Sequence, residues 1–260
     1  FAPLADAPNG VQKLRELILQ LAVQGKLVPQ DSNDEPTAVL LAKIKAEKER
    51  LIQEKKIKKS EPLPPIEADE VPFDLPKTWE WVRLDDVCRD CGQKVPNQPF
   101  TYIDVSSINK ERGIISEEVK LLTAANAPSR ARKLVEVGTV IYSTVRPYLL
   151  NIAIIDKAFD PEPIVSTAFA VLHPLRGLFN KFLYHYLRSK PFIEYVEAEM
   201  TGMAYPAIND TKLQKGLVPI PPLAEQRRIV SKVDQLMALC DELEAQQQQQ
   251  QTARVKLNNA

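Results

Sequence analysis

Glycine and histidine are scarce in this chain of 260 residues, which has eight glycines and two histidines. The glycines form neither GxGxxG nor GxxxxGK[ST], so the sequence offers no dinucleotide-binding turn and no phosphate-binding loop. His173 and His185 stand apart and make no recognisable Ser-His-Asp or Cys-His arrangement. Because these common catalytic patterns are missing, we expect a protein that is not an enzyme and that uses no cofactor.

Cysteine is rare as well. Cys88, Cys91 and Cys240 are too few for a disulfide framework and fit a reducing compartment, so we expect a cytoplasmic protein. Cys88 and Cys91 form a single CxxC, whereas a structural zinc site needs four ligands and no second pair is present. We therefore expect ordinary thiols and no metal, with zinc binding or a redox pair as the alternatives.

Net charge and long apolar runs are also missing. The 34 basic residues equal the 34 acidic ones, so the overall charge favours neither binding nor avoidance of nucleic acid, and a DNA contact must come from local patches. No apolar run approaches the roughly 20 residues of a membrane-spanning helix, so we expect no membrane segment. The charged share of 26% and the hydrophobic share of 44% are typical of a folded protein.

Two helices are predicted within residues 1–60. Asn9 is typical of an N-cap and Gly25 of a helix stop, and apolar residues recur between them at helical spacing: Val11, Leu14, Leu17, Ile18 and Leu21. The second helix should carry Pro36 in its first turn and the basic run 55–59 at its C-terminal end, where cations favour the helix dipole. We interpret that run as a solvated face, with DNA-backbone contact as the alternative.

A proline-rich stretch, residues 61–82, predicts an extended linker. Trp79 and Trp81 should anchor the globular domain that follows, because residues two apart on a strand face the same side. Short runs rich in β-branched and aromatic residues, interrupted by one helix over about 177–200, then predict a mixed, β-rich α+β domain over 83–222.

The last segment, residues 223–260, predicts a long helix. Its apolar positions alternate in steps of four and three, which is the seam of a coiled coil: Ile229, Val233, Leu236, Cys240 and Leu243. We expect this seam to pack against the helices of residues 11–58. Beyond it comes a run of glutamines, which we predict to continue the helix, with a disordered tail as the alternative.

Polar and basic residues suited to DNA contact gather in four stretches of the β-rich domain. Arginine and lysine can pair with phosphates or guanine, and asparagine with adenine. Taken singly, each stretch fits a solvated loop better than a DNA contact, because loops are polar anyway, but the clustering of the four in one domain favours the DNA contact. The candidates are Asn109, Lys110 and Arg112 in a turn, Arg130, Arg132 and Lys133 in a loop, Ser143, Thr144, Arg146, Tyr148 and Asn151, and finally Thr201, Tyr205 and Asn209.

One pattern of a metal-dependent nuclease is present. Asp104, Glu118 and Lys120 follow the D…ExK layout that holds Mg²⁺ beside a lysine, yet carboxylates and lysines are abundant enough for it to arise by chance. We interpret these residues as a turn and an exposed strand, and keep a nuclease as an alternative.

Four stretches taken together resemble the specificity (S) subunit of bacterial type I restriction–modification enzymes. They are VQKLRELILQLAVQGKLVPQ, DLPKTWEWVRLDDV, GTVIYSTVRPYLLNIAI and LVPIPPLAEQRRIVSKVDQLMALCDELE, and they occur in this order over most of the chain. The combination of an LPxxWxW start and an IPPLxEQ end is specific. The resemblance implies a target-recognition domain that reads one half of a bipartite double-stranded DNA target, and helices that dock the methyltransferase subunits of a complex that also contains a restriction subunit.

The family pattern has two recognition domains, whereas this sequence has one. The resemblance therefore implies either the N-terminal half of a longer protein or a half-subunit that forms a homodimer. The competing hypothesis is a coiled-coil adaptor that binds only proteins, which fits the helices equally well but leaves the β-rich domain unexplained.

Overall fold

The computed structural model of the protein describes residues 9–117 and 119–258, beginning with two helices, α2 (Gly10–Val23) and α3 (Thr37–Gln53). Gly25 adopts a φ of 67° just beyond α2 and so acts as the predicted stop. Asn9 precedes α2 as predicted, but its side chain makes no capping hydrogen bond. The basic run 55–59 lies beyond α3 instead of forming its last turn, because the helix ends at Gln53 and Lys55 takes a φ of 56°.

The linker is pinned to the folded body. The 3₁₀ turn η1 (Ala68–Glu70) supplies Glu70, which accepts hydrogen bonds from the Arg83 guanidinium at 2.6 and 2.8 Å. Strand β1 (Glu80–Arg83) then pairs antiparallel with β12 (Leu217–Ile220). This pair joins the start of the β-rich region to its end. Trp79 is buried one residue before β1, and Trp81 packs on the same core, as the spacing of the two tryptophans predicts.

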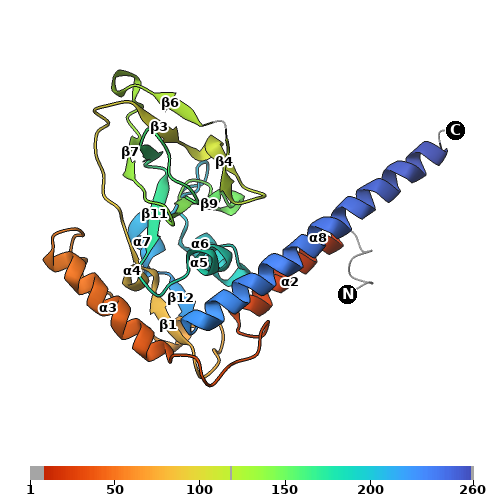
Figure 1. Cartoon of the computed structure of the whole chain (residues 1–260), viewed down its shortest axis with the longest axis horizontal. Helices are drawn as coiled ribbons and strands as arrows, with labels where there is room; N and C mark the ends of the chain where they lie inside the picture. The colour runs from red at the N-terminus through yellow and green to blue at the C-terminus, as the bar shows by residue number, and fades with distance from the viewer. Residues whose placement is uncertain (1–8, 118, 259–260) are drawn as a thin grey trace.

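Two four-stranded sheets form the β-rich body in the upper part of Figure 1. The first has the order β6-β3-β10-β7 and the second β2-β11-β8-β9; β3 and β10 are parallel, and the other pairs are antiparallel. Ile103, Ile141 and Phe169 are fully buried in one apolar cluster that draws on both sheets. The strands are β2 (Cys88–Arg89), β3 (Phe100–Ile103), β6 (Lys120–Leu122), β7 (Ala131–Leu134), β8 (Val140–Ser143), β9 (Ile152–Ile154), β10 (Pro163–Ser166) and β11 (Phe169–Pro174).

Shorter elements connect the strands and complete the mixed α+β fold, which confirms the predicted fold class. A hairpin, β4 (Ile108–Asn109) with β5 (Ile114–Ile115), lies beside β9. Three 3₁₀ turns are η2 (Val105–Ser107), η3 (Ala124–Asn126) and η4 (Pro147–Leu149), and two short helices are α4 (Leu84–Val87) and α7 (Asp210–Lys215).

The single helix predicted over 177–200 is wrong, since two helices occupy this range, α5 (Asn180–Leu187) and α6 (Lys190–Glu199). Pro191 has no N–H to offer the helix and its ring would clash with the preceding turn, so the chain restarts with this proline in the first turn of α6. Ser189 occupies the break and donates its hydroxyl to the carbonyl of Tyr186 at 2.6 Å.

The long helix α8 (Leu223–Asn258) leaves the body and runs along α2 (Figure 1). Its 36 residues span about 54 Å at 1.5 Å per residue. Helix α2 runs antiparallel to it, because Gln30 contacts Glu225 whereas Arg15 pairs with Asp241. The glutamine run lies within α8, so the helical prediction is confirmed.

The predicted seam packs against α2 as expected, but the second helix in contact with α8 is α5, and not the second of the two helices predicted within residues 1–60. Ile229, Val233 and Cys240 are buried, and Leu236 and Leu243 are half-buried against the same core as α2. Helix α3 does not share this packing; it contacts α4 and lies on the other side of the β1–β12 pair in Figure 1. Among the described helices, none has the length and hydrophobicity needed to cross a bilayer.

Candidate nucleic-acid interface

Two loops meet at one edge of the β-rich body and carry half of the predicted DNA-contact residues. The first connects β8 to β9 over residues 144–151, and the second connects α6 to α7 over residues 200–209. The Arg146 N–H donates to the Pro206 carbonyl at 2.8 Å, and the Ile208 N–H donates to the Thr144 carbonyl at 3.0 Å. These bonds fix the two loops relative to each other, although they lie about 60 residues apart in the chain.

Arg146 stands at the centre of this joint surface. Its φ of 47° is in the left-handed region, which few non-glycine residues adopt and which recurs at functional sites. The exposed guanidinium carbon lies 5.2 Å from the centre of the Tyr205 ring, within the range of a cation–π contact. The backbone bond to Pro206 and the aromatic contact therefore hold an exposed arginine in one orientation.

The same two loops expose apolar side chains. Ten large apolar residues are exposed in the described part of the chain, and five of them lie here: Val145, Tyr148, Leu149, Met203 and Tyr205. A concentration of exposed apolar surface marks a binding site more often than a solvated loop. This observation separates the two loops from the solvated connections that the sequence favours for each stretch taken singly.

The β4–β5 hairpin brings a third group of candidates beside the first loop. Arg188, the residue after α5, donates to the carbonyls of Lys110 at 3.2 Å and Leu150 at 3.3 Å, so it bridges the hairpin tip and the 144–151 loop. Asn109, Lys110 and Arg112 are all exposed, and the Asn109 side chain accepts the Arg112 N–H at 3.1 Å. The turn predicted from the sequence is confirmed at this hairpin.

The predicted loop around residues 129–133 is only half a loop, because Ala131–Leu134 forms β7. Arg130 is exposed just before the strand, and its carbonyl accepts the Thr167 N–H at 2.8 Å. Arg132 is half-buried on the strand. Lys133 points inward, is 4% exposed and forms an ion pair with Asp210, so it cannot reach a duplex in this conformation.

The remaining candidates differ in burial, and several of them use their side chains for hydrogen bonds within the chain. Ser143 donates its hydroxyl to the Val145 carbonyl at 2.9 Å, and Thr144 donates to the Ala168 carbonyl at 3.0 Å; both are buried. Asn209 is exposed, but its side chain caps α7 by accepting the Lys212 N–H at 2.8 Å. Asn151 is half-buried, and Thr201 is exposed at the base of the second loop.

Four candidate cations are exposed on the β-rich body: Lys110, Arg112, Arg130 and Arg146. Within residues 9–117 and 119–258, none of them has an acidic partner at ion-pair distance. Sixteen such pairs of a lysine or arginine with a carboxylate occur elsewhere in the same residues. Unpaired exposed cations are suited to neutralising phosphates, because no internal salt bridge has to be broken first.

The described residues do not support the nuclease alternative. Asp104 caps η2: burial favours its neutral form, but hydrogen bonds from Ser106 and Lys120, the latter at 2.9 Å, outweigh burial and lower its pKa. Glu118 lies outside the described residues. In the part of the chain that is described, no three His, Cys, Asp or Glu side chains gather as metal ligands would.

The three cysteines are free thiols. Cys88 is buried, and burial raises its pKa. Burial also raises the pKa of Cys91, to about 11, which keeps this thiol protonated at neutral pH. Both cysteines therefore have the protonation state of ordinary structural thiols.

A polar joint that sequence reasoning missed connects the body to α8. Gln226 is fully buried; its Oε1 accepts the Phe179 N–H at 2.7 Å, and its Nε2 donates to the carbonyls of Gly177 and Pro221, each at 3.0 Å. Glu225 is buried next to it and accepts from Gln30 at 2.6 Å, and burial raises its pKa. The sequence indicated this joint only through the polar pair Glu225 and Gln226 at the start of an otherwise apolar seam.

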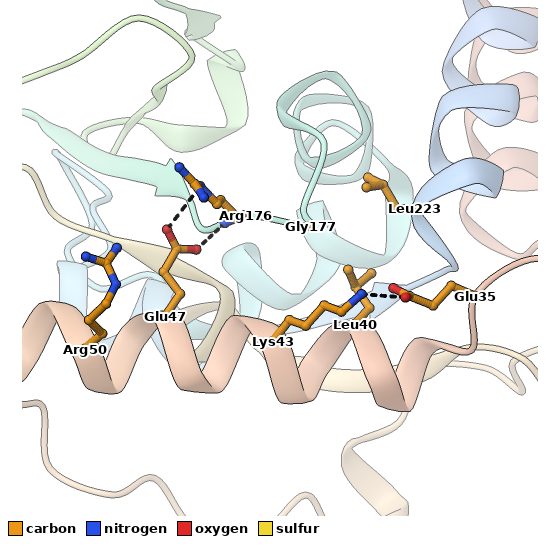
Figure 2. A pocket seen from close by; sticks show the side chains of 8 residues that line it. All are labelled: Glu35, Leu40, Lys43, Glu47, Arg50, Arg176, Gly177 and Leu223. Carbon is orange, nitrogen blue, oxygen red and sulfur yellow. Dashed lines mark hydrogen bonds and ion pairs between the residues drawn. The ribbon is translucent and has the colours of Figure 1, made fainter.

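A shallow groove next to this joint holds no free charge. Figure 2 shows α3 crossing below the loop before α5, with Lys43 turned toward Glu35 and Glu47 turned toward Arg176. Lys43 Nζ lies 2.5 Å from the Glu35 carboxylate, and Glu47 accepts the backbone N–H of Arg176 at 2.6 Å. We therefore interpret the groove as a packing contact between α3 and the body, and not as a binding site.

The fold and this edge together define a recognition module carried on a long helix. The chain belongs to the family described as Type I restriction modification DNA specificity domain, whose family model matches residues 76–252. The resemblance seen in the sequence is therefore confirmed.

This chain matches only part of the length of its relatives. It is 36% identical over 246 residues to the Type I restriction enzyme EcoAI specificity subunit of Escherichia coli, covering 91% of this chain and 41% of that protein. The crystal structure of the HsdS subunit from Thermoanaerobacter tengcongensis is 38% identical with a TM-score of 0.65, covering 72% of this chain and 49% of the other.

A further solved structure concerns an assembly. It is described as the structural basis underlying complex assembly and conformational transition of the type I R-M system, and it is 37% identical with a TM-score of 0.64 over 72% of this chain and 49% of the other. The chain thus spans about half the length of these solved relatives.

Proposed function

We propose that this chain is a non-catalytic DNA-recognition part of a type I restriction–modification complex, and that it reads one half of a bipartite target. The observation that carries the proposal is the edge where the loops 144–151 and 200–209 meet. It combines an oriented, exposed arginine with exposed aromatic and apolar side chains, beside cations that have no acidic partner among the described residues. The family to which the chain belongs supports the same function.

The proposed mechanism uses two kinds of contact, one with phosphates and one with a base. Lys110, Arg112 and Arg130 would neutralise phosphates and set the register on the duplex without carrying sequence information. Arg146, held against Tyr205, would pair with a guanine in the major groove. A good bidentate pair gives about 1–3 kcal/mol of discrimination against the wrong base. Because the arginine is already oriented, less side-chain entropy is lost on binding.

We also propose that residues 83–222 act as the recognition domain and residues 223–260 as a spacer helix that docks methyltransferase subunits. The restriction subunit would join the same complex, and a homodimer would form if the chain acts as a half-subunit. Helix α8 supports this because it is long, about 54 Å, and α2 pairs with its first half. The place of action would be the cytoplasm, where the DNA lies and free thiols persist.

The experiment is a binding titration of the chain, assembled with its methyltransferase subunits, on labelled duplexes. Selection from randomised DNA supplies the half-site, and scrambled duplexes of equal composition serve as controls. We expect tighter binding to the selected half-site, weakening with added salt as phosphate contacts require. Equal binding to selected and scrambled DNA would refute the proposal, and an assembly that forms without any DNA affinity would favour the protein-only adaptor.

A further inference from the structure

The loop between α6 and α7 is a closed, pre-shaped projection. Thr201 and Ala207 exchange both backbone hydrogen bonds, each at 2.9 Å, and so seal the loop at its base. Inside it, Gly202 takes a φ of 96°, and a Cβ at this position would lie 2.9 Å from the carbonyl oxygen of Tyr205. Only glycine fits there without a shift, so this shape of the loop depends on Gly202.

The tip of this loop offers apolar surface to the solvent. Met203 has an exposure of 103%, so its side chain is as accessible as in an extended peptide. Gly202 and Ala204 beside it are exposed as well, and residues 201–209 contain no charged side chain. This loop, closed at its base, holds a methionine fully in water, where the side chain contributes nothing to folding, so a contact outside the chain explains its exposure better.

The neighbours of the tip indicate what that contact is. Tyr205, two residues further on, lies under the Arg146 guanidinium, and Val145 pairs with Ala207 at the base of the loop. An uncharged tip therefore emerges beside a cation suited to guanine. The major groove of B-DNA presents a partner for each of them. Guanine offers its O6 and N7 acceptors to an arginine, and thymine offers its 5-methyl group to an apolar side chain. The minor groove presents no methyl group.

We propose that Met203 contacts the 5-methyl group of a thymine in the major groove of the half-site, next to the base read by Arg146. This inference rests on the proposed function and adds a specificity-determining residue to it. The contact discriminates thymine from cytosine by burying a methyl group, a chemistry that arginine and asparagine side chains cannot supply.

The test removes one methyl group at a time. In the assembled complex, each thymine of the selected half-site is replaced singly by uracil, which lacks only the 5-methyl group, and dissociation constants are measured. We expect one position to lose about fourfold in affinity, the effect of burying one methyl group. Met203→Ala should abolish the thymine–uracil difference at that position and leave the other positions unchanged.

Leu121→Ala is the matched control, because Leu121 is also an exposed apolar residue but lies on β6. It should keep the full uracil effect. A half-site without an affected thymine would overturn the inference, as would a uracil effect that persists in Met203→Ala. Equal weakening on every duplex would overturn it in favour of a wedge between base pairs, and loss of subunit assembly would overturn it in favour of a protein contact. Failure of the wild-type complex to prefer any half-site would instead refute the proposed function.

Discussion

Replacing Gln226 tests the joint between the recognition body and the spacer helix. Gln226→Ala removes three hydrogen bonds of 2.7–3.0 Å at a fully buried position and leaves the Phe179 N–H without its acceptor. A buried donor left unsatisfied costs about 1–3 kcal/mol, and the two carbonyls lose a shared donor as well. We therefore expect the free energy of unfolding to fall by about 3 kcal/mol.

Gln226→Glu separates hydrogen bonding from side-chain volume. One carboxyl oxygen can still accept the Phe179 N–H, but the other then faces the carbonyls of Gly177 and Pro221, which only accept. The carboxyl must keep its proton, so its folded-state pKa is raised above the unfolded value of about 4.3. Stability is then fully present below that value and is lost as the pH rises through the folded-state pKa.

The assay is urea unfolding followed by far-ultraviolet circular dichroism at several pH values. Gln235→Ala, on the exposed face of the same helix, is the control and should stay within about 0.5 kcal/mol of wild type. If Gln226→Ala also stays within that range, or if Gln226→Glu shows no added pH dependence, the hydrogen-bonded joint does not stabilise the fold as reasoned.

Three shorter predictions concern the same helix and the thiols. Ile229→Ala should lower the free energy of unfolding by about 2–5 kcal/mol because Ile229 is fully buried. Leu239→Ala, on the exposed face, should change it by less than about 0.5 kcal/mol. Equal effects of the two substitutions would contradict the packing of the α8 seam. Burial raises the pKa of Glu225, so this residue contributes stability that is lost as the pH rises above about 4.3, and Glu225→Gln should remove that contribution and leave the similar one of Asp86, whose pKa burial also raises. A thiol reagent at pH 8 should find Cys88 unreactive and Cys91 slow in the native protein and both fast in urea; rapid native labelling would contradict their burial and raised pKa values.

Much of the fold could be predicted because it depends on local patterns. The apolar spacing of α2 and the four–three steps of α8 set their packing faces directly. The partners of α8 could not be predicted, since α2 and α3 carry similar stripes and α5 belongs to the β-rich domain, so the choice among them depends on the path of the whole chain. The break at Ser189 was missed because apolar spacing continues across it, although Pro191 gave the signal.

The site was predicted in residue type more than in geometry. Sequence reasoning selected Arg146, Tyr148 and Tyr205 for their chemistry, but the contact between two loops about 60 residues apart needs the fold. Lys133 was selected for its charge, and its burial follows from β7, whose alternating side chains the sequence did not reveal. The sequence does not distinguish Met203 as a contact residue, because methionine usually lies in a core.

The salt dependence of DNA binding tests the central claim most directly. For the assembled complex on its selected half-site, the slope of log Kd against log salt concentration is measured for wild type, Arg112→Ala, Arg146→Ala and Lys77→Ala, the last an exposed cation on the linker. We predict that Arg112→Ala lowers the slope by about one without changing preference, that Arg146→Ala relaxes specificity at one base pair, and that Lys77→Ala changes neither. Identical slopes and identical preferences in all four proteins would contradict a DNA interface at this edge.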